Sequence, residues 1–245
     1  MNKYTLFSFA LGALVLVGAG CAISDSTPDG VNEGLEDTLG ITQDADSDHE
    51  DNENEDNDNM DTDTDSQGEV SLSDFTAPPT SHPGVLKDAD RLDRTVTIKT
   101  SKGDVTVELF GEESPMAVSN FLVLANTGYY DGIIFHRVIK GFMIQGGDPT
   151  GTGTSGPGYQ FADELGGAHT TYPIGTLAMA NSGPNTNGSQ FFVMHGDVPL
   201  PNAYTIFGQV TAGQDVIDAI AESETSGPPR DKPVTDITID SIELN

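Results

Sequence analysis

The sequence predicts a mainly β domain, an antiparallel barrel capped by helices, which follows a long acidic segment that does not fold. Three observations support this prediction. From about residue 85 onward, short runs of alternating apolar and polar residues are separated by glycine-containing turns, as in antiparallel sheets. Only two stretches there have the spacing of an amphipathic helix. Ahead of them, 19 of the 39 acidic residues lie between Asp25 and Asp74, where large apolar residues are few.

Residues 1–21 have the pattern of a signal peptide. A basic start at Lys3 precedes an apolar run, Leu6 to Val17, which is too short for a membrane-spanning helix. Small residues then lead to Cys21, and this ending resembles the bacterial lipoprotein signal, although Gly18 stands where that signal usually has Leu. We therefore expect an exported protein with a lipid on Cys21, anchored at the periplasmic or extracellular face of the cell envelope. A secreted protein and an uncleaved anchor stay open as alternatives.

Residues 22–84 are predicted to be a disordered acidic linker. Like charges repel, so this segment is expected to be extended and to hold the domain away from a membrane. The alternative is calcium binding, because Asp61, Asp63 and Asp65 have the spacing of the first ligands of a calcium loop. The sixth position of that pattern is not glycine and the twelfth is not glutamate, which favours a solvated spacer.

Charge and cysteine content exclude several classes of function. The net charge of −29 argues against nucleic acid, because phosphate binding needs a cationic face. A single cysteine permits no intrachain disulfide, and the five histidines lack metal-ligand spacing. We therefore expect no metal; the expectation of no cofactor follows from the reaction considered below.

The domain is predicted to span residues 85–245 and to open with a β-hairpin. Two alternating runs, residues 95–100 and 105–109, flank a short turn that contains glycine. A helix is then predicted to start at Ser114 and Pro115, with Ser as N-cap, and to end at Gly128. Its buried face is Val118, Phe121, Leu122 and Ala125.

The remaining elements follow the same logic. A glycine-rich loop, residues 146–158, lacks the Gly-Lys-Ser/Thr ending of a phosphate loop. A second helix is predicted over residues 214–221, with Val216, Ile217 and Ile220 facing inward. The last strand, residues 237–244, changes phase between Ile239 and Ile242, which indicates a bulge.

Two stretches have the composition of a functional site. Residues 135–148, FHRVIKGFMIQGGD, place one cation, Arg137, among apolar side chains, with Gln145 close by. Residues 179–192, MANSGPNTNGSQFF, add amides and aromatics. Together these stretches resemble the active-site signature of the cyclophilins, a family of peptidyl-prolyl cis/trans isomerases, and the resemblance extends over about residues 95–244. It implies a closed eight-stranded antiparallel barrel with a helix at each end.

The reaction implied by the resemblance is rotation about the bond before a proline, which has a barrier of about 18–20 kcal/mol. No bond breaks, so the enzyme needs a permanent hydrogen-bond donor for the prolyl nitrogen and an apolar pocket for the ring. An arginine suits the first task because it keeps its proton. By the resemblance, Arg137 has the catalytic role, and the substrate-binding residues are His136, Phe142, Met143, Gln145, Gly151, Ala180, Asn181, Gln190, Phe192, Leu200 and Tyr204.

Within that set the resemblance implies distinct roles. The proline pocket is expected from Phe142, Met143, Phe192 and Leu200, and the amides around the moving carbonyl from Gln145 and Gln190. Ala180 and Asn181 are expected to offer backbone groups, Gly151 belongs to a flanking loop, and His136 is expected to have a supporting role. Two positions depart from the best-known members: Pro199 replaces a Trp, and Tyr204 replaces a His.

The sequence thus predicts a monomeric, exported peptidyl-prolyl isomerase that acts on proline-containing polypeptides and helps exported proteins to fold. The alternative is a non-catalytic module that binds proline peptides, or acts as a scaffold, at the cell surface. An intact Arg137 favours turnover, because a capture module could lose this residue without penalty.

Overall fold

The computed structural model describes residues 70–245. The predicted signal peptide, Cys21 and most of the acidic segment, with the aspartates considered for calcium, lie outside the described residues. None of the helices in the described part is long and apolar enough to cross a membrane. In chain order the elements are a 3-10 helix (Leu72–Asp74), α1 (Asp88–Arg91), β1 (Thr95–Thr100), β2 (Gly103–Leu109), α2 (Pro115–Asn126), β3 (Arg137–Ile139), β4 (Met143–Gly146), β5 (Thr176–Met179), β6 (Phe191–Met194), β7 (Ile206–Ala212), α3 (Gln214–Ala221) and β8 (Ile239–Leu244).

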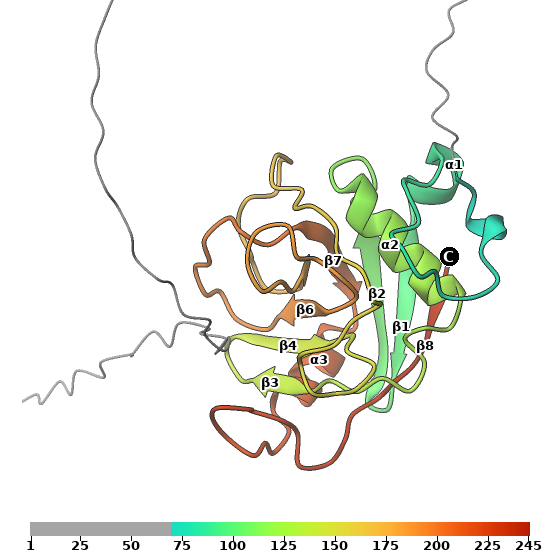
Figure 1. The fold of residues 1–245 in the computed structure, drawn as a ribbon. Coiled ribbons are helices and arrows are strands. Elements are labelled where there is room, and N and C mark those ends of the chain that lie inside the picture. Colours follow the sequence, from blue (N-terminus) through green and yellow to red (C-terminus); the bar gives the residue numbers. More distant parts are fainter. Residues whose placement is uncertain (1–69) are drawn as a thin grey trace, which may run out of the picture. The chain divides into compact units, whose positions relative to one another are not determined.

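The eight strands form one antiparallel sheet in the order β3-β4-β6-β5-β7-β2-β1-β8, which curls as Figure 1 shows. Its two edge strands are linked through the segments that precede them. The Gly132 N–H donates to the Ile239 carbonyl (2.7 Å), the Ile239 N–H to Ile133 (2.7 Å) and the Phe135 N–H to Ile237 (2.9 Å). The ends of the sheet therefore meet, and the predicted mainly β, eight-stranded antiparallel fold is confirmed.

The predicted hairpin and bulge are both present. β1 and β2 pair in register from Thr95 opposite Glu108 to Thr100 opposite Gly103. In the β1–β8 ladder, Lys99 lies opposite Ser241 but Thr100 opposite Ile239, so Asp240 is an extra residue. This bulge explains the change of phase that the sequence shows, because an extra residue returns the next side chain to the same face.

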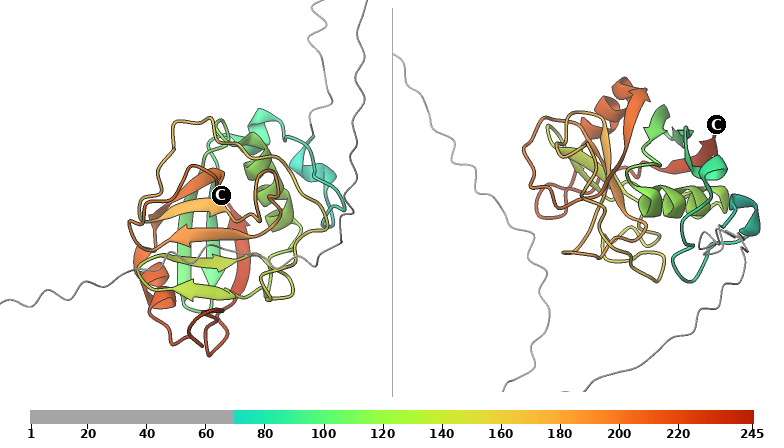
Figure 2. Two further views of the ribbon diagram at one scale, coloured as in Figure 1. Left: turned by 60° about the vertical axis from the view of Figure 1, so that its left-hand side comes forward. Right: turned by 90° about the horizontal axis from the view of Figure 1, so that it is seen from above.

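The two predicted helices are α2 and α3, and they lie apart on the barrel (Figure 2). The predicted inward residues of α2 are all buried, and in α3 Ile217 and Ile220 are buried and Val216 is half-buried. Past the end of α2, Gly128 has a φ of +71°, a left-handed conformation that glycine adopts without strain. The structure adds a third, short helix, α1, which the sequence did not predict.

The start of α2 differs from the predicted serine cap. The Ser114 hydroxyl donates to the Ile206 carbonyl at 2.6 Å and does not bind the helix. Instead, the Glu164 carboxylate accepts the N–H groups of Met116 and Ala117, each at 2.9 Å. A carboxylate from a distant loop thus satisfies the free donors of the helix start and opposes its positive dipole end.

Strand alternation divides the sheet into two apolar faces. Val138, Ile144, Val193 and Leu177 point into the main core, which also receives α2 and the inward side of α3. Their strand neighbours Met143, Phe192, Met194 and Ala178 belong to a second, separate apolar cluster. Successive side chains of a strand point to opposite faces, so this second cluster lies outside the barrel, on β4, β5 and β6.

Residues 70–84 are part of the folded unit, so the predicted linker end at residue 84 is wrong. Val70 bridges to Leu86, and Val70, Leu72 and Phe75 pack against the main core. The His82 ring packs against Phe161, with ring centroids 4.9 Å apart. These apolar contacts hold a segment whose average composition predicts disorder. We call residues 70–94 the strap; it lies beside α2 and far from β3 and β4 in each view of Figures 1 and 2.

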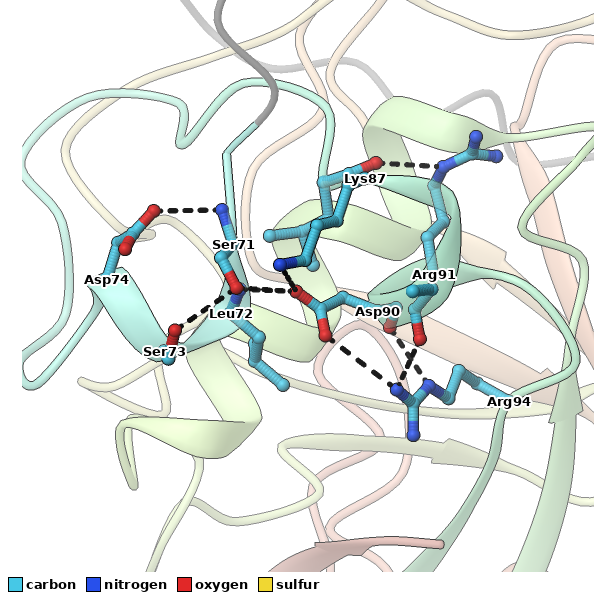
Figure 3. A network of polar contacts seen from close by, with 10 residues as sticks. Ser71, Leu72, Ser73, Asp74, Lys87, Asp90, Arg91 and Arg94 are labelled. Carbon is cyan, nitrogen blue, oxygen red and sulfur yellow. Dashed lines mark hydrogen bonds and ion pairs between the residues drawn. The ribbon is translucent and has the colours of Figure 1, made fainter.

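A polar network centred on Asp90 fixes the strap (Figure 3). The Asp90 carboxylate accepts the Ser71 hydroxyl (2.8 Å) and the Leu72 N–H (2.9 Å). Arg94 donates through Nε to the Asp90 carbonyl (3.0 Å) and lies 3.8 Å from the Asp90 carboxylate. The bond from the Leu72 N–H is the main reason why the pKa of Asp90 is lowered, with burial acting against it.

Candidate active site

The register of the strands brings three predicted site residues into one row. Arg137 on β3 lies opposite Gln145 on β4, and Gln145 lies opposite Phe192 on β6. Phe192 in turn lies opposite Ala178 on β5. Since Phe192 and Ala178 belong to the outer apolar cluster, the row runs across the outer face of the barrel.

The outer cluster contains the side chains that were predicted to form the proline pocket. Met143 and Phe192 are buried in it, while Phe142, Ala180, Leu200 and Tyr204 are half-buried and pack against it. The Phe192 and Tyr204 rings meet edge to face, with centroids 5.5 Å apart and planes at 88°. The result is an apolar, aromatic surface that is partly open to solvent and suits a proline ring.

Arg137 stands at the edge of this surface and is half-buried. Among residues 70–245 its guanidinium has no ion pair and no side-chain hydrogen bond, whereas most other basic side chains there are paired with carboxylates. In a half-buried arginine, a guanidinium without an acceptor in the described part is a donor that remains available to a ligand.

The two predicted glutamines form a chain of amides. Gln145 Nε2 donates to Gln190 Oε1 at 2.9 Å, and Gln190 Nε2 donates to the Ser155 carbonyl at 2.8 Å. This chain fixes the orientation of both side chains next to Arg137 and connects them to the glycine-rich loop.

The glycine-rich loop is folded around the carboxylate of Asp148, a residue that is 1% exposed. It accepts the N–H groups of Thr150 (2.7 Å), Gly153 (2.6 Å) and Ser155 (3.1 Å). Burial alone would raise the pKa of Asp148, but these bonds outweigh burial and lower it to about 2. Gly151 is in this loop at φ +63°, and an added Cβ would lie 2.9 Å from Ile134.

His136 does not join the pocket. Its side chain is buried, and an added Cβ at Gly153 would lie 3.4 Å from its Nε2, which places the ring beneath the glycine-rich loop. Neither ring nitrogen has a hydrogen-bond partner among the described residues. Burial lowers the pKa of His136 and outweighs the opposing charge of Asp148, so the ring is neutral at pH 7. The expected supporting role fits this position better than contact with substrate.

Ala180 and Asn181, which were predicted to bind substrate, each use one hydrogen-bond donor within the protein. The Ala180 N–H donates to the Gln190 carbonyl at 3.0 Å, so this group is not free for a peptide. The Asn181 side chain donates to the Ala203 carbonyl at 2.8 Å. Asn181 therefore also holds the loop that carries Leu200 and Tyr204.

Tyr172 is a site residue that the sequence did not indicate. Its hydroxyl donates to the Tyr204 carbonyl (2.9 Å) and accepts the Tyr204 N–H (3.1 Å), and its buried ring belongs to the outer cluster. A single tyrosine in a polar run has no periodicity, so no sequence signal marks it. No group of His, Cys, Asp and Glu within residues 70–245 could hold a metal ion.

The comparison with known families agrees with this geometry. Residues 95–244 match the family described as cyclophilin type peptidyl-prolyl cis-trans isomerase. The chain belongs to the cyclophilins. As a cyclophilin, it is a member of an enzyme family, the peptidyl-prolyl cis-trans isomerases. The strap lies before the matched region.

Similar proteins include several isomerases of this name. The probable peptidyl-prolyl cis-trans isomerase A of Mycobacterium leprae is 47% identical over 169 residues, which cover 62% of this chain and 92% of the relative. The Arabidopsis thaliana isomerase CYP18-1 is 47% identical over 155 residues, 62% of this chain and 96% of the relative. A crystal structure of a cyclophilin type isomerase from Cryptosporidium parvum is 41% identical, with a TM-score of 0.59, and covers 62% of this chain and 97% of that one.

Proposed function

We propose that this cyclophilin accelerates cis/trans rotation of X-Pro bonds in exported polypeptides, with Arg137 as the hydrogen-bond donor to the prolyl nitrogen. The observation that supports the proposal most is the Arg137 guanidinium, which has no internal acceptor in the described part and stands beside an apolar, aromatic surface. A similar Cryptosporidium parvum structure, 41% identical with a TM-score of 0.58, was determined in the presence of the dipeptide Ala-Pro.

The chemistry follows from the electronic structure of the amide. Rotation removes amide resonance, so the prolyl nitrogen becomes pyramidal and gains a lone pair that accepts a hydrogen bond. A donor fixed where that lone pair develops stabilises the transition state more than the ground state. The apolar wall of Phe142, Met143 and Phe192 holds the ring, and the amides of Gln145 and Gln190 lie next to Arg137 for the carbonyl that moves.

The test measures exchange of an Ala-Pro peptide by NMR with the full chain and with Arg137→Ala. We expect the native protein to speed exchange and the variant to lose about 100-fold in kcat/KM, the usual cost of removing a transition-state donor. Lys102→Ala is the matched control, because Lys102 is an exposed cation in the β1–β2 turn. If both the native protein and the Arg137→Ala variant bind the peptide but neither speeds exchange, the apolar surface beside Arg137 is a capture site and the catalytic proposal is wrong.

We further propose that a lipid on Cys21 anchors the protein at the cell envelope. The support is the sequence alone: small residues precede a lone cysteine at the end of a short apolar run. Mass spectrometry of the mature N-terminus tests this, with an expected chain that begins at a lipid-modified Cys21. A mature chain that begins elsewhere contradicts the proposal.

A further inference from the structure

His195 directly follows β6 and contacts the turn that carries Phe142. It is outside the set of residues that the family resemblance indicates. Its Nδ1 accepts the N–H of Gly141 at 2.8 Å. The N–H groups of His195 (2.8 Å) and Gly196 (3.2 Å) donate to the Phe142 carbonyl. Three contacts from one short segment therefore hold the turn between β3 and β4 from both sides of the Gly141–Phe142 peptide.

Among residues 70–245, the His195 ring is the acceptor of the Gly141 N–H. Gly141 has a φ of +76°, so it lies in the turn between Ile139 and Phe142, where the Phe142 N–H returns to the Ile139 carbonyl at 3.0 Å. The turn itself offers the Gly141 N–H no backbone acceptor, and because Gly141 is exposed, this N–H would bond to water in the absence of the His195 ring. The His195 ring supplies the missing acceptor, and Gly196 permits the close approach, because an added Cβ there would meet the Gly141 carbonyl.

The same contacts indicate which nitrogen of the neutral His195 ring carries the proton. Because Nδ1 accepts a hydrogen bond, the proton of the neutral imidazole is on Nε2. Nε2 lies 3.5 Å from Asp218 Oδ1 on α3, and the side chain is 13% exposed. The neighbouring charges are Lys140 in the turn and Glu222 at the end of α3, which pair with each other at 2.9 Å. His195 thus stands between α3 and the wall of the pocket.

We propose that His195 is a positioning residue for substrate binding: it fixes the Gly141–Phe142 turn through Nδ1 and so sets the position of the Phe142 ring on the outer cluster. This inference rests on the proposed function of that surface as the proline pocket. The contact precedes the chemical step and is equally present in ground and transition states, so its loss raises KM and leaves kcat unchanged.

The experiment compares His195→Ala, His195→Gln and His195→Asn in the full chain. The asparagine Oδ1 takes the place of Nδ1 as an acceptor, whereas the glutamine oxygen reaches the position of Nε2. With an Ala-Pro peptide, we expect Ala and Gln to raise KM about fivefold with kcat within about twofold, and Asn to restore KM. Hydrogen exchange of the Gly141 amide gives a readout independent of activity: protection is retained in Asn and lost in Ala and Gln.

Asp218→Ala is the matched control, because it removes the partner of Nε2 and leaves the Nδ1 contact intact; KM is expected to stay at the native value. The proposal is overturned if His195→Ala keeps the native KM, or if it lowers kcat without raising KM. It is also overturned if His195→Asn has the same KM as His195→Ala, or if Asp218→Ala raises KM as much as His195→Ala does. A native chain that does not speed exchange would instead refute the proposed function, while the Gly141 amide would still report the contact.

Discussion

The Tyr172 hydroxyl makes two hydrogen bonds to the backbone of one pocket residue, Tyr204. Tyr172→Phe removes both and leaves a backbone donor and acceptor of Tyr204 without their partner. We expect a loss of about 1–3 kcal/mol in the free energy of unfolding and a higher KM, because the Tyr204 ring packs edge to face against Phe192 in the outer cluster. Urea unfolding and peptide exchange measure the two effects.

Tyr129→Phe serves as the control for this prediction. Among the described residues, the Tyr129 hydroxyl has one hydrogen-bond partner, the Ser189 hydroxyl at 3.1 Å, and the Tyr129 ring packs against the main core and not against the outer cluster. We therefore expect the Tyr129→Phe variant to have nearly the same KM as the native protein. Equal KM values in native protein and Tyr172→Phe would show that the pocket does not depend on the backbone contacts of Tyr204.

Asp148 makes the glycine-rich loop sensitive to acid. Its pKa in the folded chain, about 2, lies below the ordinary value of 3.8, so its contribution to stability is complete above pH 4 and is lost as the pH falls toward 2. A shift of that size corresponds to about 2.5 kcal/mol. We expect Asp148→Asn to be less stable than the native chain at pH 7, with a smaller loss between pH 4 and pH 2 in urea titrations. An unchanged acid slope in the variant would exclude this role.

Among the elements, the strap is the one whose first part, residues 70–84, was predicted to be disordered but is folded. It follows directly after the acidic segment, and its residues Val70, Leu72 and Phe75 reach the main core. The Asp90 carboxylate connects the two ends of the strap by accepting hydrogen bonds from Ser71 and Leu72 (Figure 3). Arg91 donates to the carbonyl of Leu86 within the strap and to the carbonyl of Gly111, which connects the network to the rest of the domain. A side chain in place of Gly111 would collide with Arg91, so the strap and the start of the domain fit closely.

This arrangement predicts where the chain can be shortened. A chain of residues 70–245 should be more stable than one of residues 85–245 by at least about 2 kcal/mol, because the shorter chain exposes the core surface that Val70, Leu72 and Phe75 cover. Chemical denaturation of both chains measures the difference. If the two chains had the same free energy of unfolding, residues 70–84 would not contribute to the folded domain, and the domain boundary would lie at residue 84.

The elements also show what the sequence can predict. The hairpin, α2, α3 and the bulge in β8 each depend on local spacing, and the structure has all of them. The sequence did not predict that the strap folds, because the composition of residues 22–84 as a whole is acidic and polar. The few apolar residues at its end become significant only through their contacts with a core that is distant in sequence. The cap of α2 could not be predicted either, since Glu164 comes from a loop far along the chain. Tyr172 and His195 act through contacts that only the tertiary fold creates.

At the scale of the whole molecule, charge is the dominant feature. The chain carries a net charge of −29, and residues 70–245 alone hold 21 acidic and nine basic residues. Several of the basic residues are already paired with carboxylates, so much of the exposed negative charge has no counterpart in the described part. Such self-repulsion favours solubility and opposes the compact state.

Salt should therefore stabilise this protein, because counterions screen repulsion between exposed carboxylates. We expect the Tm to rise by about 2–4 °C, equivalent to about 1 kcal/mol, when NaCl is raised from about 0.05 to about 0.5 M. The variant Glu108→Gln, Glu112→Gln, Glu224→Gln removes three exposed carboxylates without internal partners in the described part, so it should be more stable at low salt and respond less to added salt. A Tm that falls with salt in the native chain would mean that the surface ion pairs, and not the net repulsion, decide its stability.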